Sequence, residues 1–189
     1  DPLSELCDAA VAEGVVVCVA AGNAGPAAGS VGSPASARQI ITIGAATDDD
    51  RIASFSSRGP TKDGRTKPDV VFPGVDIVAC RSAGTHMGTP AGEHYTQASG
   101  TSMATPHAAG VAALLLEAEP SLSPAEVKAR FQSAAVDLGL DANTQGAGRV
   151  DAYAALKEEG PPPGPPPPPP PPPPGGCLTL PLQLLGIHL

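Results

Sequence analysis

The sequence predicts an α/β fold, and two observations carry that prediction. Stretches with helical periodicity and short apolar strands occur in the order helix, strand, loop, strand and then two helices, which is typical of α/β chains. Apolar residues make up 41% of the 189 residues, but aromatic residues only 3%. A core of this composition must be built from Ala, Val, Ile and Leu, which suits layered packing of helices on a sheet.

The first predicted elements are a helix and a strand. Apolar residues recur at the i, i+3, i+4, i+7 and i+8 positions of one helix face, namely Leu3, Leu6, Cys7, Ala10 and Val11. Gly14 is placed to end this helix. The continuous apolar run 15–19 predicts a strand buried on both faces. This strand leads into Ala20, Ala21, Gly22 and Asn23, a loop at the carboxyl end of a strand, where ligands tend to bind in α/β sheets.

Loops and short strands alternate in the middle of the chain. Residues 25–37 are rich in Gly, Ser, Ala and Pro, and residues 58–68 are polar with turn signals, so both are predicted loops. Short apolar runs predict strands at 40–45, 70–71 and 75–79. The acidic run 48–50 predicts a solvated turn in preference to a cation site.

Two further helices follow. Residues 103–116 are apolar nearly all round, which predicts a buried helix. Pro106 is tolerated only in a first turn, so this helix should begin near Ser102. The next helix opens with a capping box, in which Ser123 is the N-cap, Pro124 is N1 and Glu126 is N3. Its predicted apolar face consists of Val127, Phe131, Ala134 and Ala135.

Ser102 stands at the mouth of a predicted helix, where two interpretations compete. Helix N-termini present unpaired N–H groups and a partial positive charge, which can support a nucleophile and a developing oxyanion. Serine is also a common N-cap residue with no chemical role. Periodicity alone favours the N-cap.

The exact sequence of residues 100–107 favours the nucleophile over the N-cap. Residues 100–107 resemble the nucleophile signature of the subtilase family; they are Gly100, Thr101, Ser102, Met103, Ala104, Thr105, Pro106 and His107. Other stretches resemble the family in the same order: 17–25, 54–60, 67–71, 73–75 and 108–114. The resemblance spans about residues 3–153. It implies a three-layer α/β sandwich with a mainly parallel sheet and helices on both faces, and a serine-type endopeptidase that acts through an acyl-enzyme on Ser102.

The resemblance also implies the surrounding roles. The amide of Asn23 and the backbone N–H of Ser102 would form the oxyanion hole; the alternative is that Asn23 simply makes a turn. Ala20, Ala21 and Gly22 would line one wall of the substrate pocket. Ser33–Pro34 matches a position that is often cis. No cofactor or metal is expected for the chemistry, and the resemblance allows structural calcium at a site that the sequence does not place.

The base and its orienting carboxylate are expected elsewhere. In the family they precede the serine in the order Asp, His, Ser, and both should lie upstream of Asn23. We therefore expect this polypeptide alone to be inactive and its parent protein to be active. The histidines present, at 86, 94, 107 and 188, are not expected to act as the base, and His107 is interpreted as a buried structural residue. The alternative is a non-catalytic subtilase fragment or pseudoenzyme with a proline-rich interaction tail.

Charge and cysteine content exclude other classes. The net charge of −8 argues against nucleic-acid binding, which needs a basic face. None of Cys7, Cys18, Cys80 and Cys177 forms a C-x-x-C pair, so a zinc or redox motif is not expected, and Cys7 and Cys18 are interpreted as small buried hydrophobes. No run is long enough to span a membrane, and no signal peptide opens the chain. The resemblance implies a polypeptide substrate and secretion.

The chain divides into three predicted parts. Residues 1–158 form the C-terminal part of the catalytic domain, 159–176 a polyproline linker, and 177–189 a short apolar tail that is predicted to be disordered. Residues 161–174, interrupted only by Gly164, predict a polyproline II rod. This rod is a spacer, a ligand for a proline-reading domain, or an out-of-frame translation of a GC-rich gene.

Overall fold

The protein is described by a computed structural model that covers residues 1–157 in detail. The predictions for the linker 159–176 and the tail 177–189, including Cys177 and His188, lie outside the described residues. None of the helices within residues 1–157 is both long and apolar enough to cross a membrane.

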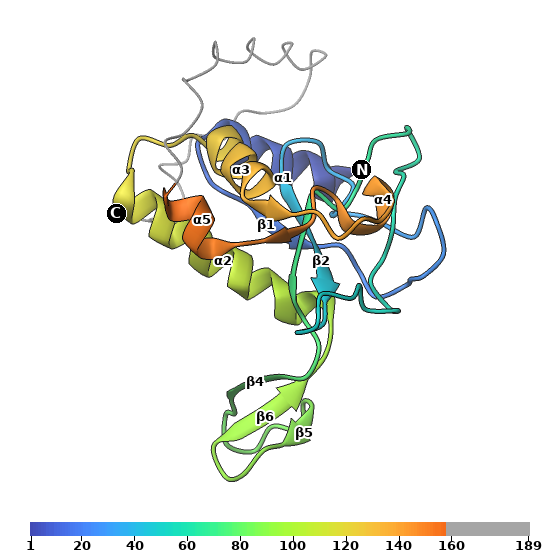
Figure 1. Cartoon of the computed structure of the whole chain (residues 1–189), viewed down its shortest axis with the longest axis vertical. Coiled ribbons are helices and arrows are strands. Elements are labelled where there is room, and N and C mark those ends of the chain that lie inside the picture. The colour runs from blue at the N-terminus through green and yellow to red at the C-terminus, as the bar shows by residue number, and fades with distance from the viewer. Residues whose placement is uncertain (158–189) are drawn as a thin grey trace.

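Two sheets make up the strand content of the described residues. The larger one has the order β1–β2–β3–β8–β7, in which β1, β2, β3 and β8 are parallel and β7 is antiparallel to β8. In this order its strands are Cys18–Ala20, Ile41–Ala46, Val70–Pro73, Arg149–Val150 and Ala135–Val136. The smaller, antiparallel sheet has the order β4–β6–β5, with strands Ile77–Cys80, Tyr95–Ala98 and Thr89–Pro90. Residues 77–98, here called the arm, project from the body of the molecule (Figure 1).

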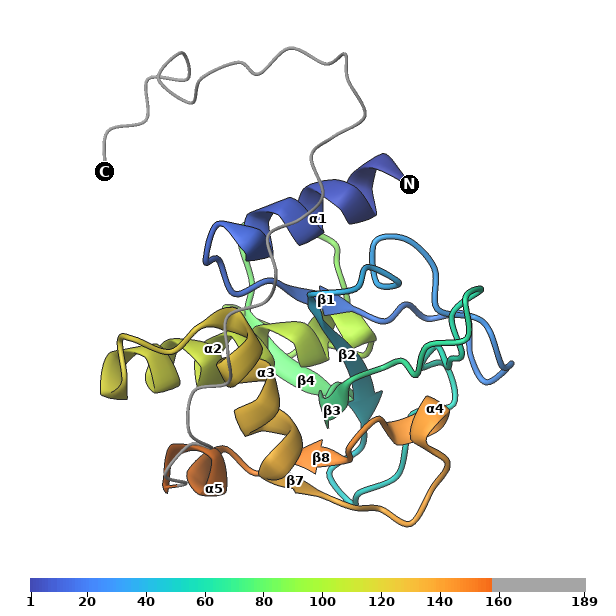
Figure 2. The same cartoon turned by 90° about the horizontal axis from the view of Figure 1, so that it is seen from above.

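Helices cover both faces of the larger sheet. They are α1 (Pro2–Ala12), α2 (Thr101–Ala118), α3 (Pro124–Ser133), α4 (Ala142–Gln145) and α5 (Ala152–Lys157). Successive side chains at β1 point to opposite faces. Val17 and Val19 pack with Val11 of α1, whereas Val16 and Cys18 pack against the core that α2 and α3 share. The predicted α/β sandwich with helices on both faces is therefore confirmed; Figure 2 shows the strands following one another from β1 beside α1 to β7 beside α5.

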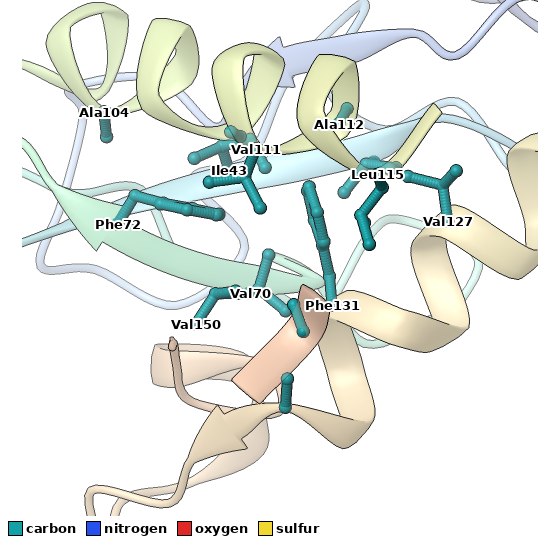
Figure 3. Packing of buried hydrophobic residues seen from close by; sticks show 14 of the residues in the cluster. Ile43, Val70, Phe72, Ala104, Val111, Ala112, Leu115, Val127, Phe131 and Val150 are labelled. Atoms are coloured by element: carbon teal, nitrogen blue, oxygen red, sulfur yellow. The ribbon is translucent and has the colours of Figure 1, made fainter. Parts of the chain in front are cut away.

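The main core lies between the centre of the sheet and helices α2 and α3. Every residue of β2 is buried, as expected for a central parallel strand. Phe72 of β3 meets Phe131 of α3 edge to face, with ring centroids 5.6 Å apart (Figure 3). Phe131 and Leu115 of α2 are fully buried. This packing fixes α2, whose N-terminus carries Ser102.

Local signals placed α3 correctly. The Ser123 side chain accepts from the Glu126 backbone N–H at 3.3 Å, and the Glu126 carboxylate accepts from the Ser123 N–H at 2.7 Å. Pro124 occupies the first turn, as predicted. The buried face includes Val127 and Phe131.

The apolar face predicted for α1 is confirmed only near its C-terminal end, where Val11 is buried and Cys7 packs in the same cluster. Leu3 and Leu6 are 52% and 68% exposed, and the buried residues of the helix are Ser4 and Val11. The carboxylate of Asp8 accepts from the backbone N–H groups of Arg38 and Gln39, at 3.1 and 2.8 Å. This polar anchor turns the Asp8 side of the helix toward residues 38 and 39, and Leu3 and Leu6 remain exposed.

Two further elements are more exposed than the sequence predicted. They are the strand predicted at 15–19, which corresponds to β1, and the helix predicted at 103–116, which corresponds to α2. β1 starts only at Cys18 and is half-buried, because β2 is its sole strand neighbour among residues 1–157. Cys7 and Cys18 are accordingly half-buried, and burial still raises the pKa of the Cys18 thiol to about 11. On α2, the outward side chains of Ala109, Ala113 and Leu114 are exposed, since no described segment covers that face.

Candidate active site

The loop after β1 and the start of α2 meet at the carboxyl edge of the sheet. Ala21 is tied to the neighbouring strand, where its N–H donates to the Ile43 carbonyl at 2.9 Å. Gly22 follows with φ +105°, a left-handed conformation that glycine adopts without strain. Its N–H donates to the Thr101 hydroxyl at 3.2 Å. The turn therefore delivers Asn23 to the N-terminus of α2.

Asn23 is held with its amide in a defined orientation. Its Oδ1 accepts from the backbone N–H of Thr101 at 2.9 Å and from the Thr101 hydroxyl at 3.0 Å. With the oxygen fixed in this way, Nδ2 must point to the other side. Nδ2 has no hydrogen-bond acceptor among the described residues. The side chain thus presents free N–H donors beside the helix start.

Ser102 lies in the first turn of α2 and is exposed. The N-cap of this helix is Gly100, and no side chain caps it, so Ser102 does not serve as the N-cap. The Gly100 N–H donates to the Gly74 carbonyl at 2.8 Å, which ties the turn to the body. The backbone N–H of Ser102 has no acceptor within residues 1–157. A free hydroxyl and a free backbone donor therefore coincide at the positive end of a helix of 18 residues.

Both side chains open into one hollow of about 570 Å³. We refer to it below as the hollow; its lining includes Asn23, Asp76, Met87, Ser99, Ser102 and Met103. The structure thus brings together the two residues that the sequence singled out for chemistry, although they are 79 positions apart.

The other predicted site residues lie differently. Ala20, Ala21 and Gly22 do not line the hollow, and Ala21 is 1% exposed. Ala20 and Gly22 are half-buried. Ser33–Pro34 is cis, as the resemblance implied.

None of the histidines within residues 1–157 lines the hollow. His107 is exposed, contrary to its interpretation as buried, and its Nδ1 lies 2.9 Å from the Met103 carbonyl. The residue is on the uncovered side of α2. His86 and His94 lie on the exposed surface of the arm.

A metal centre has no counterpart in the described part of the chain. Residues 1–157 contain no group of three or more His, Cys, Asp or Glu side chains that could hold a metal ion. The acidic run at 48–50 forms a turn in which Asp50 pairs with Arg149 and Asp49 with Arg51. A hydrogen bond from Thr47 and the charge of Arg51 lower the pKa of Asp49. Arginines therefore neutralise two of these three carboxylates.

A buried ion-pair cluster lies at the amino ends of β2 and β3. The Asp69 carboxylate, 8% exposed, contacts Lys67 Nζ at 2.7 Å and Lys128 Nζ at 2.8 Å, and also accepts from the Thr42 N–H. Lys67 is 2% exposed, and burial lowers its pKa to about 8. A buried carboxylate with three donors locks β3 to β2 and to α3, and removing one partner would leave an unpaired charge.

Sequence reasoning missed three contributors to the site. Thr101 orients Asn23, and Asp76 and Met87 form the far wall of the hollow. Thr101 belongs to the motif 100–107, but nothing in that motif indicates a contact with Asn23. Residues 84–90 are rich in glycine, which is typical of a surface loop, but they contain β5. The signal in this loop was Gly88, whose left-handed φ serves a close strand approach.

Comparisons with known proteins identify the family. The profile of the Subtilase family matches residues 1–149. Serine protease AprX of Bacillus subtilis is 44% identical over 165 residues, covering 80% of this chain and 37% of that protein. Subtilisin DY of Bacillus licheniformis is 37% identical over 157 residues, covering 82% of this chain and 52% of that protein. The chain thus spans about half or less of the length of these relatives.

Solved structures give the same result. Fervidolysin from Fervidobacterium pennivorans, a keratinolytic enzyme related to subtilisin, superposes with a TM-score of 0.67 at 31% identity, covering 84% of this chain and 25% of that one. The self-cleaved protease domain of PatA superposes with a TM-score of 0.64 at 28% identity, covering 82% of this chain and 53% of that one.

Proposed function

Because the chain belongs to the subtilase family, we propose that it is the serine-bearing part of an endopeptidase that hydrolyses peptide bonds through an acyl-enzyme on Ser102. The observation that carries this proposal is the pairing of a free Ser102 hydroxyl with an Asn23 amide whose oxygen is already held by Thr101. Both groups face the same hollow, which is open to a polypeptide.

The proposed chemistry assigns one role to each group. Ser102 Oγ attacks the substrate carbonyl carbon and gives its proton to the general base, and the carbonyl oxygen becomes an oxyanion. When this intermediate collapses, the C–N bond breaks, the amine leaves with that proton, and the acyl-enzyme remains for water to hydrolyse. Asn23 Nδ2 and the Ser102 backbone N–H donate to that oxygen, and the N-terminal dipole of α2 adds a favourable charge. A donor of the Asn23 type contributes about 10²–10³ in kcat, a value measured in a subtilisin.

The general base and its orienter are proposed to come from outside this sequence. A serine nucleophile needs a histidine within hydrogen-bond reach and a carboxylate to hold that histidine. Since His86, His94 and His107 do not line the hollow, we expect upstream Asp and His residues of the parent protein to complete the site. This chain alone should then hydrolyse peptides poorly.

Further expectations follow from the family. The substrate is a polypeptide, with Ala20, Ala21 and Gly22 on the side of the residues that precede the scissile bond. The chemistry needs no cofactor, because every proposed role is taken by a protein group. Secretion of the parent protein and structural calcium elsewhere in it remain part of the proposal.

The test is covalent labelling by an organophosphonate, which reacts with an activated serine. The parent protein, with its upstream segments, should be labelled at Ser102, and mass spectrometry of the peptides should locate the adduct. Ser99 is a matched internal control, because it lines the same hollow and is exposed but lacks the proposed activation. A completed protein that is not labelled, or that is labelled equally at Ser99, would be a non-catalytic relative.

A further inference from the structure

The arm supplies part of the lining of the hollow, including Met87, Gly88 and Thr89. Gly88 has φ +72°, and a Cβ at this position would lie 2.4 Å from the Gln97 carbonyl oxygen. The segment before β5 therefore lies flat against β6. The buried Thr96 hydroxyl donates to the Met87 carbonyl at 2.6 Å. These two contacts fix the backbone at Met87, whose side chain is 61% exposed at the rim of the hollow.

The hollow contains a carboxylate without a cationic partner. Asp76 lies between β3 and β4 with φ +56°, and its N–H donates to Ser99 Oγ at 2.8 Å. Ser99 Oγ in turn lies 3.3 Å from Asp76 Oδ1, to which it donates. Asp76 is the one ionisable side chain among the described residues that line the hollow. It is exposed and makes no ion pair within residues 1–157.

The position of the hollow assigns it to one side of the scissile bond. This step rests on the proposed function, in which Ala20, Ala21 and Gly22 face the residues that precede the bond. The hollow is lined by Asn23, Ser102 and residues of the arm, and none of Ala20, Ala21 and Gly22 lines it, so we assign it to the residues that follow the bond. The part of the substrate that leaves as the free amine therefore lies in the hollow.

We propose that the hollow selects a lysine or arginine in the leaving segment of the substrate, next to the scissile bond. Met87 and Met103 offer polarisable apolar surface to the aliphatic stem of such a side chain. Long cationic side chains pack their stems in this way while their charged ends stay in water. The charged end then lies beside Asp76, whereas an acidic side chain at the same place is repelled.

The experiment uses the parent protein and two fluorogenic peptides that differ only in the residue after the scissile bond. One peptide has lysine there and the other norleucine, which has the stem without the charge. We expect kcat/KM to be about two- to fivefold higher for lysine, the range of an exposed ion pair. The preference should fade as salt approaches about 1 M, because exposed charges are screened.

Asp76→Asn tests the carboxylate. Asparagine keeps an acceptor for Ser99 and tolerates the left-handed backbone, so the ratio of lysine to norleucine should fall to about one. Glu93→Gln is the matched control, since Glu93 is an exposed arm carboxylate that does not line the hollow, and the ratio should stay as in the unchanged protein. Met87→Ala should lower kcat/KM for both peptides together.

The outcomes separate this inference from the proposed function. Hydrolysis of a simple methyl ester by the parent protein, without any lysine preference, overturns the inference and leaves the peptidase proposal standing. A lysine preference that survives Asp76→Asn or high salt also overturns it. A parent protein that neither hydrolyses the ester nor reacts with the organophosphonate overturns both.

Discussion

The central strands of the larger sheet and the strands of the arm differ in how much of each is covered. All six residues of β2 are buried, whereas three of the four residues of β4 and both residues of β5 are exposed. The proposed nucleophile lies between these regions, at the end of β6 and the start of α2. A rigid core thus holds Ser102, and a thin exposed sheet shapes the space in front of it.

The difference follows from how each sheet is built. Parallel strands with helices on both faces have the side chains of both faces buried. Phe131 of α3 packs into the core on one of these faces. The arm has three short strands that no helix within residues 1–157 covers, so Val78 and Tyr95 are 56% and 49% exposed. Regions with few buried contacts open locally at low cost. Stability should therefore reside in the body, and specificity can change in the arm without loss of the fold.

The largest expected effect is a core deletion in the body. Phe131→Ala removes a fully buried ring that packs on Phe72, and the free energy of unfolding should fall by about 3–5 kcal/mol. Tyr95→Ala removes an aromatic ring of the arm that is half exposed and should cost about 1 kcal/mol or less. Urea denaturation of both variants measures the contrast. Similar losses of unfolding free energy from the two substitutions would show that the arm contributes as much to stability as the core.

A comparable loss is expected in catalysis when the donor on the body side of the site is removed. Asn23→Asp keeps the oxygen that accepts from Thr101 but removes the proposed oxyanion donor. In the parent protein kcat should fall by at least about 10²-fold, with little change in KM. Steady-state kinetics on a peptide substrate would measure this, and an unchanged kcat would contradict the role of Asn23.

The next effect is a pH dependence of stability, and it is expected from Lys67 in the body of the molecule. Burial lowers the pKa of Lys67 from 10.5 to about 8, so the folded chain loses this proton at a lower pH than the unfolded chain. Between about pH 8 and 10.5 the unfolded state binds more protons, and the free energy of unfolding should therefore rise with pH. The rise should be up to about 3 kcal/mol and absent below pH 8.

Lys67→Met is the variant that isolates this effect, because methionine has a stem of similar length without the amine. Denaturation curves at several pH values should lose the rise between pH 8 and 10.5 in this variant. A rise that persists in Lys67→Met would assign it to other groups, and an unchanged protein without any rise would contradict the lowered pKa.

The smallest expected effect is confined to the arm. Gly88→Ala places a methyl group 2.4 Å from the Gln97 carbonyl in a left-handed backbone, so β5 should separate from β6. Gly92 has a similar φ of +84° but nothing within 4 Å of an added Cβ, so Gly92→Ala is a control for backbone strain alone. Amide hydrogen exchange should accelerate at Thr89 and Gln97 only in Gly88→Ala. The unfolding free energy of the body should change by less than about 1 kcal/mol in either variant.

Structural features that depend only on residues close together in the chain could be predicted from the sequence. The capping box of α3 depends on residues three apart, and the order of the elements depends on local periodicity. The roles suggested for Asn23 and Ser102 came from motif resemblance, and the structure places the two side chains at one hollow. Their roles in catalysis remain predictions.

Features that depend on distant partners could not be predicted in this way. The orientation of α1 is set by Asp8 binding the backbone at Arg38 and Gln39, which no helical pattern contains. The apolar runs of β1 and α2 predict burial. Burial also needs a neighbouring segment, and none of the described segments covers the exposed faces of these two elements. The wall formed by Asp76 and Met87 arises only when the arm folds back beside Ser99.

The pairing of β3 with β8 joins Val71 to Arg149, and this connection has a consequence for how the chain is made. Contacts between residues so far apart in sequence form slowly, because a long loop must close before any stabilising energy is gained. During synthesis on the ribosome, β3 keeps an unpaired edge until the segment containing Arg149 has emerged. Until that pairing forms, the edge of β3 is open to pairing with other chains.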